Sequence, residues 1–299
     1  MKIALSGSTG LVGARLASFL AAAGHSVIPI KRVHQDTSSP SSVAWNPSSA
    51  YLDLKALEGL DAIIHLAGDN VASGRWTKAK KDRIRSSRVV GTRQLVRALT
   101  QLAQPPQHFF CASAVGVYGD AGATECDETS LAGDGFLASV CQDWEAEANR
   151  VAEIGIRPVL LRFGVILDPA GGALKRMLLP FRLGLGGRLG SGQQFLSWIA
   201  APEIPPIIAF LLEQDNLSGP INMVAPSPLT NADFTATLAK HLRRPAIIPV
   251  PAIIIRLLMG EMGQDMLLSS CRALPSKLLD AHYSFQFPTV SSYLASPKS

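Results

Sequence analysis

Three glycines spaced three residues apart, directly after a short apolar run, constrain this chain more than any other feature. The run at residues 3–5 is followed by Gly7, Gly10 and Gly13, and an amphipathic pattern then continues until Gly24. A strand that turns into a helix through such glycines brings backbone N–H groups and a helix N-terminus close to a pyrophosphate. The opening therefore predicts a β-α-β dinucleotide-binding unit, whose second strand is the segment SVIPI.

The same residues imitate a secretory signal peptide, because a lysine near the start precedes apolar and small residues. A signal peptide needs an unbroken apolar core, whereas three glycines, two hydroxyl residues and Arg15 interrupt this one. We therefore favour the nucleotide-binding interpretation. We expect a cytoplasmic protein, with an organelle as the alternative for a eukaryotic source.

Composition favours a buried parallel sheet over several other classes of protein. Hydrophobic residues make up 47% of the 299 residues, and near-continuous apolar strands would explain this proportion. No apolar stretch reaches the length of a membrane span, so we expect no membrane partner. The four cysteines and six histidines form neither C-x-x-C nor H-x-x-x-H pairs, so we expect no metal site.

The net charge of +5 has one concentration, at residues 74–93. Such a basic stripe could face nucleic acid. However, Ile84, Val89, Leu95 and Leu99 mark the buried side of a helix, and no recognition motif accompanies the cations. We therefore expect cations in water, no nucleic-acid partner, and a small molecule as the ligand.

Alternating strands and helices extend the opening pattern over residues 1–168. The apolar segments LDAIIHLAG, HFFCASAV and IRPVLLRFGVIL alternate with the basic helix and with a helix in FLASVCQDWEAEANRVAEIG. The alternation predicts an α/β fold with a Rossmann doubly wound parallel sheet. From residue 169 to 299 glycine and proline increase, which predicts a smaller C-terminal substrate-binding lobe, partly interleaved with the first domain. Ligands should lie in the cleft outside the carboxyl ends of the strands.

The end of the second strand bears on the choice of dinucleotide. An acidic residue there would bind the ribose 2′-hydroxyl of NAD, but Lys31 and Arg32 occupy this place and Asp36 comes later. Cations can pair with the 2′-phosphate of NADP, although they could also be two solvated surface residues. We therefore predict NADP(H), with NAD(H) as the alternative. The predicted cofactor-binding residues are Gly7, Ser8, Thr9, Gly10, Leu11, Val12, Gly13, Lys31, Arg32, Leu66, Ala67 and Gly68.

A long series of segments resembles the atypical extended short-chain dehydrogenase/reductases. They include SGSTGLVG, DAIIHLAGDNVASGRWT, SSRVVGT, CASAVGVYGD, LRFGVILDPAGGAL and LPFRLGLGGRLGSGQQFLSWI, and the similarity runs to about residue 290. Within that family the chain is similar to the NAD-dependent epimerase/dehydratase type, in the branch named for nucleoside-diphosphate-sugar epimerases. The resemblance implies a nicotinamide cofactor and oxidoreductase or isomerase-like chemistry.

The resemblance also implies a hydroxyl residue near the strand end before VYG, and a Tyr-x-x-x-Lys pair on the next helix. In the family the lysine lowers the tyrosine pKa and holds the nicotinamide ribose; here Leu137 and Cys141 stand in those positions. Without such a cation a phenol is a poor base. Ser113 and Tyr118 are the remaining catalytic candidates, although Tyr118 could equally be a packed turn residue. Cys141 could be a reactive thiol or a core cysteine.

Departures from the family pattern also affect the substrate. The arginine that holds the diphosphate in sugar-nucleotide epimerases corresponds to Leu196 here. The substrate candidates are Arg162, Arg182, Arg188 and Gln193, although Arg162 could instead brace the C-terminal lobe. Two functions stay open: an NADP(H)-dependent oxidoreductase or epimerase-like enzyme, and a non-catalytic NADP(H)-binding protein with a redox-sensing or regulatory role.

Overall fold

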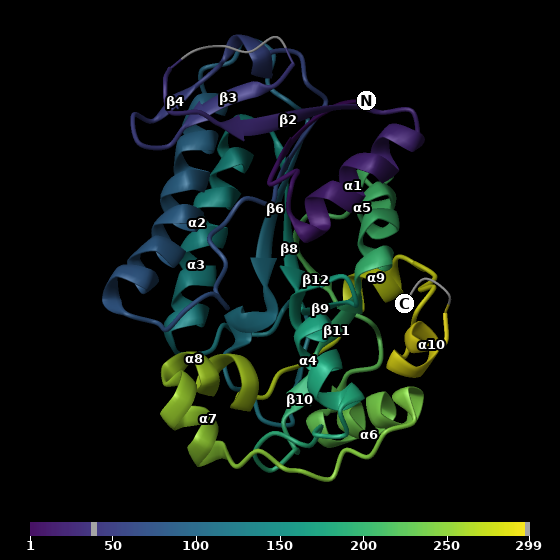
Figure 1. The fold of residues 1–299 in the computed structure, drawn as a ribbon. Coiled ribbons are helices and arrows are strands. Elements are labelled where there is room, and N and C mark those ends of the chain that lie inside the picture. Colours follow the sequence, from purple (N-terminus) through teal and green to yellow (C-terminus); the bar gives the residue numbers. More distant parts are fainter. Residues whose placement is uncertain (37–40, 297–299) are drawn as a thin grey trace.

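An eight-stranded sheet lies at the centre of the protein, whose computed structural model describes residues 1–36 and 41–296 (Figure 1). Seven neighbouring strands run parallel, and only the last pairs antiparallel. This arrangement confirms the predicted Rossmann-type α/β fold. In sheet order the strands are β12 (Gly219–Met223), β8 (Arg157–Phe163), β6 (His108–Ala114), β5 (Ala62–His65), β1 (Lys2–Ser6), β2 (Ser26–Arg32), β3 (Val43–Asn46) and β4 (Tyr51–Leu52).

Two pairs of helices enclose this sheet (Figure 1). One pair is α1 (Leu11–Ala22) with α5 (Ile204–Glu213), and the other is α2 (Lys78–Leu99) with α3 (Phe136–Asn149).

Successive side chains of a strand point to opposite faces, so each face has its own apolar core. On β1, Ile3 and Leu5 pack in the core that includes Leu16 of α1, whereas Ala4 packs in the core that includes Leu95 of α2. Both faces of the sheet are therefore buried, which explains why its strands are apolar throughout.

A second lobe has a third core, which contains Trp198, Phe234 and Tyr293. Its strand pairs are short. The strand β12 also comes from this part of the sequence, but it forms the edge of the main sheet beside β8. The elements outside the main sheet and its four covering helices are β7 (Glu125–Cys126), β9 (Val165–Asp168), α4 (Gly172–Arg182), β10 (Phe195–Leu196), β11 (Trp198–Ala200), β13 (Leu229–Thr230), α6 (Asn231–Leu242), α7 (Ala252–Met259), α8 (Glu261–Gly263), β14 (Arg272–Ala273), α9 (Ser276–Asp280) and α10 (Val290–Leu294).

The segment IRPVLLRFGVIL is two strands rather than the single strand that its composition predicts. The chain breaks at Gly164, after which β9 leaves the main sheet and pairs with β11. A Cβ atom on Gly164 would lie 2.7 Å from the carbonyl oxygen of Ser197 and 2.8 Å from a methyl group of Val224. Glycine at this point therefore lets the chain pass closely between the two lobes.

Within the described ranges, none of the helices combines the length and the apolar character needed to cross a bilayer.

Candidate functional site

The glycines after β1 form a tight turn at the carboxyl edge of the sheet. Gly7 has a positive φ of 72°, and its carbonyl oxygen accepts a hydrogen bond of 2.9 Å from the backbone nitrogen of Gly10. A Cβ atom on Gly13 would lie only 2.1 Å from that carbonyl oxygen. Gly10 makes no side-chain cap at the start of α1. The first N–H groups of this helix thus stay available to an anion.

The end of β5 is fixed directly beside this turn. The Oγ atom of Ser6 accepts hydrogen bonds from the backbone nitrogens of Leu66 at 3.1 Å and Ala67 at 3.2 Å, and it lies 2.7 Å from Nδ1 of His65. A Cβ atom on Gly7 would lie 3.0 Å from the carbonyl of Leu66. The structure thus brings together the predicted cofactor residues that follow two strands, which are 53 to 61 positions apart in the chain.

The two cations predicted to select the dinucleotide lie exposed at the end of β2. Lys31 forms no ion pair with any described residue, and the guanidinium of Arg32 lies 5.9 Å from the ring centre of Trp45. Asp36 is already engaged, because its carboxylate accepts hydrogen bonds from Asn46 and Ser49. This strand end therefore presents positive charge to a ligand and no unengaged carboxylate from Asp36.

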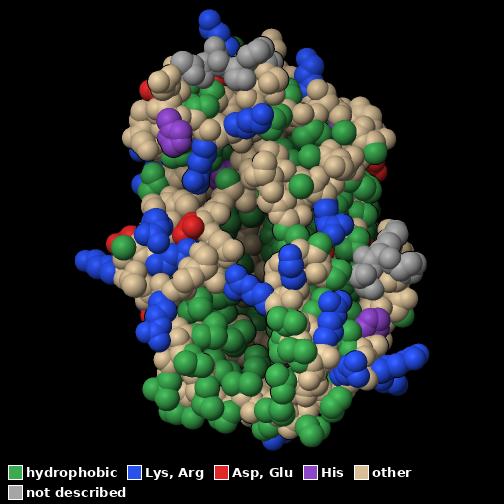
Figure 2. All heavy atoms as spheres, in the orientation of Figure 1, with side chains coloured by type: hydrophobic (Ala, Val, Ile, Leu, Met, Phe, Trp, Pro, Cys, Tyr) green, Lys and Arg blue, Asp and Glu red, His purple; other side chains and the backbone are tan. Residues whose placement is uncertain are grey.

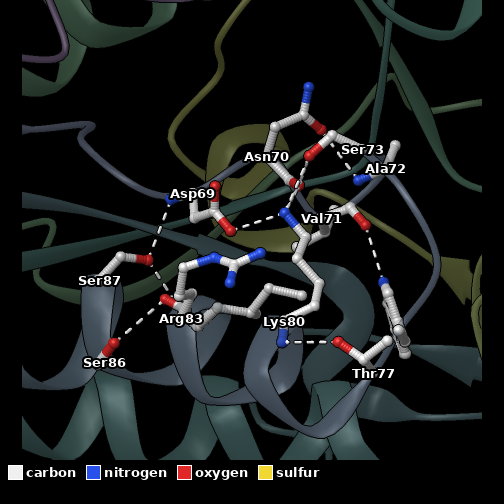
Figure 3. Close-up of polar contacts among 12 residues, drawn as sticks. Asp69, Asn70, Val71, Ala72, Ser73, Thr77, Lys80, Arg83, Ser86 and Ser87 are labelled. Atoms are coloured by element: carbon white, nitrogen blue, oxygen red, sulfur yellow. Dashed lines mark hydrogen bonds and ion pairs between the residues drawn. The ribbon is translucent and has the colours of Figure 1, made fainter.

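The loop after β5 is organised by a buried lysine at the start of α2 (Figure 3). The Nζ atom of Lys80 donates to Asp69 Oδ2 at 2.6 Å, to the carbonyl oxygen of Asn70 at 2.7 Å and to Ser73 Oγ at 2.9 Å. Burial alone would raise the pKa of Asp69, but the hydrogen bond and charge of Lys80 outweigh it and hold that pKa below its ordinary value. Three acceptors on one cation therefore anchor the loop 69–77 through its residues 69–73.

This loop contacts the C-terminal lobe at two places. Arg75 donates to the carbonyl oxygen of Leu258 in α7 at 3.1 Å, and Arg176 of α4 donates to the carbonyl oxygen of Ala72 at 3.2 Å. Figure 2 shows a hollow between the upper and lower parts of the molecule, with Lys and Arg side chains around it. The loop therefore links the two lobes in the region where a ligand should enter.

Burial of Lys80 corrects the expectation that the cations of the basic helix lie in water. Its side chain is 5% exposed, because it sits one turn before the fully buried Ile84 on the same side of α2. Arg88 follows one turn later on that side and is partly buried. The spacing of these three residues is the sequence signal that could have identified both cations.

Both catalytic candidates belong to one buried hydrogen-bond network. Ser113 Oγ donates to Glu145 Oε1 at 2.6 Å, and Arg162 forms a bidentate pair with the same carboxylate at 2.8 and 2.7 Å. Arg162 Nη1 also donates to the Tyr118 hydroxyl at 2.9 Å, and that hydroxyl lies 2.8 Å from Asn222 Oδ1. All three guanidinium nitrogens of Arg162 are therefore engaged within the protein.

Burial and the ion pair with Glu145 together set the electrostatics of this network. Burial raises the pKa of Tyr118 to about 12, although the charge of Arg162 opposes the effect. Burial would lower the pKa of Arg162, but its hydrogen bond and ion pair with Glu145 outweigh this and raise it. Tyr118 and Ser113 are 3% and 4% exposed. Tyr118 is therefore protonated at neutral pH, and neither hydroxyl is open to solvent.

The resemblance implies a Tyr-x-x-x-Lys pair on the helix that the structure shows as α3. There Leu137 lies beside the turn at Gly116. A Cβ atom placed on Gly116 would lie 3.7 Å from the Cβ atom of Leu137. Cys141 is buried, and burial raises the pKa of its thiol to about 11. These properties favour a core cysteine over a reactive thiolate.

The remaining substrate candidates lie in the C-terminal lobe, away from the buried network. Arg182, Arg188 and Gln193 are exposed, and Arg188 lines an open groove of about 500 Å³ beside α6. Arg162, by contrast, belongs to β8 and lies inside the network. Ligand binding by these four residues stays a prediction.

The parallel sheet, the glycine turn and the open start of α1 define a Rossmann-type nucleotide-binding fold. The sequence profile of the NAD-dependent epimerase/dehydratase family matches residues 3–218. The chain belongs to this family. A second profile, that of a domain of unknown function, matches residues 250–296.

Relatives from distant organisms match nearly the whole chain. The epimerase family protein Mb2239 of Mycobacterium bovis is 40% identical over 98% of this chain and 96% of its own length. The human epimerase family protein SDR39U1 is 35% identical over 98% of each chain. A crystal structure of human SDR39U1 with NADPH covers 98% of both chains with a TM-score of 0.88 and 34% identity. A nucleoside-diphosphate sugar epimerase from Corynebacterium glutamicum has a TM-score of 0.80 and 32% identity, over 99% of this chain and 57% of that one.

Proposed function

We propose that this protein binds NADP(H) at the carboxyl edge of the sheet, with the pyrophosphate over the start of α1. The observation that carries this proposal is the close packing at Gly13, where the Cβ atom of any side chain would collide with the backbone of Gly7. Because the helix packs so closely on the turn, the N–H groups of the first turn of α1 can donate hydrogen bonds to a pyrophosphate. The NADPH in the human SDR39U1 structure supports the same assignment.

Lys31 and Arg32 are the residues that would favour NADP(H) over NAD(H). Both are exposed at the strand end where the adenine ribose is expected, and an arginine can bind a phosphate through two parallel hydrogen bonds. Titration calorimetry with NADPH and NADH tests this choice. We expect tighter binding of NADPH, and Lys31→Ala with Arg32→Ala should remove the difference. Equal affinities in the unmodified protein would contradict the preference.

We further propose that the protein is an oxidoreductase or epimerase-like enzyme acting on a small molecule bound between the lobes. The bound nicotinamide would supply hydride transfer, and the protein residues would hold and orient the substrate. The loop 69–77, tied to both α4 and α7, supports this proposal because it follows the carboxyl end of β5, where the cofactor is expected, and reaches the C-terminal lobe. Its position suits a segment that excludes water from a bound substrate.

The buried network favours a second candidate, a non-catalytic NADP(H)-binding protein with a redox-sensing or regulatory role. Ser113 and Tyr118 have partners inside the protein and little exposure. A screen of carbonyl substrates that follows NADPH absorbance distinguishes the two candidates. Turnover that is lost in Ser113→Ala or Tyr118→Phe, with NADPH affinity retained, supports the enzyme. NADPH binding without turnover of any substrate supports the second candidate.

A further inference from the structure

The helix α7 exposes most of its apolar side chains to solvent. Ile253, Ile254, Leu257 and Leu258 are between 42% and 70% exposed, and Ile255 is the one buried residue of this helix. A surface helix of a globular protein ordinarily turns its apolar side to a core and its polar side to water. The apolar side chains of α7 therefore lack the contacts that would normally cover them.

A second segment of the chain extends this apolar surface. The chain after α4 runs beside the chain that leads into α7, where the backbone nitrogen of Ile248 donates to the carbonyl oxygen of Gly186 at 3.2 Å. Leu183, Leu185 and Ile247 of these two segments are each more than half exposed. Figure 2 shows hydrophobic side chains gathered at the lower end of the molecule, where Figure 1 draws α7 and the chain leading into it.

The same two segments are basic and contain no acid. Residues 175–188 and 240–258, which we call the basic apolar surface, hold eight of the 28 Lys and Arg residues and none of the 23 Asp and Glu residues. All eight cations are exposed, and none forms an ion pair with a carboxylate of any described residue. The remainder of the chain holds more acidic than basic residues. Positive charge is thus concentrated where the apolar side chains are exposed.

This charge decides which kind of partner fits the basic apolar surface. A second copy of the chain would bring the same unpaired cations against one another, and like charges across an interface repel. The core of a protein interface is also enriched in aromatic residues, whereas the exposed large apolar residues of this surface are all Leu and Ile. Apolar side chains accompanied by cations fit a bilayer with anionic headgroups. We propose that the basic apolar surface binds anionic lipid membranes.

The helix α7 would lie in the headgroup region rather than cross the bilayer. It has eight residues, far fewer than the about 20 that a spanning helix needs. The expectation of no membrane partner rests on span length, which does not detect a helix that lies on the surface. This proposal revises that expectation and goes beyond the proposed function, because it needs no bound cofactor.

The test measures sedimentation of the full chain with lipid vesicles. One set of vesicles is an equal mixture of phosphatidylcholine and phosphatidylglycerol, and the other is phosphatidylcholine alone. We expect binding to the mixed vesicles to be about tenfold tighter or more, because several cations face the anionic headgroups. Hydrogen exchange of residues 245–259 should slow when the mixed vesicles are present.

Two pairs of variants separate apolar insertion from charge. Leu257→Ser should weaken binding to the mixed vesicles about fivefold or more, whereas Leu131→Ser, which is 92% exposed but outside the surface, should not. Arg244→Gln should weaken it about threefold or more, whereas Arg97→Gln, an exposed position of α2, should not.

Three results would overturn the proposal. Equal weakening by Leu257→Ser and Leu131→Ser would show adsorption by charge without insertion. A dimer in size-exclusion chromatography that Leu257→Ser dissociates would assign the surface to a second copy. A monomer that binds neither kind of vesicle would exclude the bilayer and leave an acidic protein as the occupant. The NADPH titration is separate, so failure to bind NADPH would overturn the proposed function and leave this proposal standing.

Discussion

At the scale of single residues, steric limits and buried charge define the candidate site most sharply. The turn tolerates no Cβ at Gly13, the strand end holds His65 in contact with Ser6, and one carboxylate joins Ser113 to Arg162. Each of these residues has its effect through direct contact with one or two neighbouring residues. Single substitutions therefore test them directly.

Gly13→Ala should abolish NADPH binding and lower the free energy of unfolding by about 1–3 kcal/mol. The added methyl group would meet the carbonyl oxygen of Gly7, which is backbone and can move only with the whole turn. Ser18→Ala, an exposed substitution in the same helix, should leave both properties unchanged. Urea unfolding and calorimetric titration measure the two effects. Retained NADPH affinity in Gly13→Ala would argue against pyrophosphate at this turn.

His65 should make stability depend on pH. Burial, with a smaller contribution from the charge of Arg32, lowers its pKa from 6.5 to about 4. The unfolded chain then binds the proton more readily than the folded one, so this contribution is complete above pH 6.5 and lost as pH falls towards 4. Between pH 7.5 and 5 the loss is about 2 kcal/mol. In His65→Asn the decline over this range should shrink by that amount in urea unfolding, and identical declines would contradict the assignment.

At the scale of elements, the loop 69–77 combines irregular structure with a specific anchor. Lys80 belongs to α2, yet its side chain satisfies acceptors of the preceding loop. The loop then reaches α7 through Arg75. The position of the loop is therefore set by the helix that follows it.

Lys80→Met should release this loop. Asp69 would lose its partner, its pKa would rise, and the free energy of unfolding should fall by about 1–3 kcal/mol. Hydrogen exchange of residues 69–76 should accelerate while that of the main sheet changes little. Lys78→Met, at an exposed position of the first turn, is the control. Unaltered exchange in the loop would show that other contacts hold it.

Local patterns explain which elements could be predicted. The glycine spacing and the apolar runs depend on near neighbours in the chain, and the strands and helices that they indicate are present. The link from Ser113 through Glu145 to Arg162 joins separate strands and a helix, and no local pattern encodes it. Lys80 and Arg88 were recognisable only by their spacing from Ile84, which a count of charges overlooks.

At the scale of the whole molecule, the two lobes share the central sheet. The sheet of the nucleotide-binding part ends with β12, whose backbone pairs with β8 from Gly219↔Val159 to Met223↔Phe163. An unpaired edge strand exposes N–H and C=O groups and promotes association. The predicted boundary at residue 168 thus separates two strands that hydrogen-bond to each other.

A fragment of residues 1–168 should consequently fail to form a stable monomer. It would lack β12 and would expose the apolar β8, including Leu160 and Leu161, which are at most 1% exposed in the whole chain. Size-exclusion chromatography and circular dichroism of the fragment, beside the full chain, measure this. A soluble monomeric fragment that binds NADPH would show that β12 is dispensable.

The late arrival of β12 also matters while the chain is being made. Its partner strand in the sheet, β8, ends at Phe163, whereas β12 begins only at Gly219. At about 5–20 residues per second, a ribosome needs several seconds to synthesise the intervening segment. During that interval β8 has emerged without its neighbour, so translation speed and chaperones that shield a nascent strand become determinants of yield.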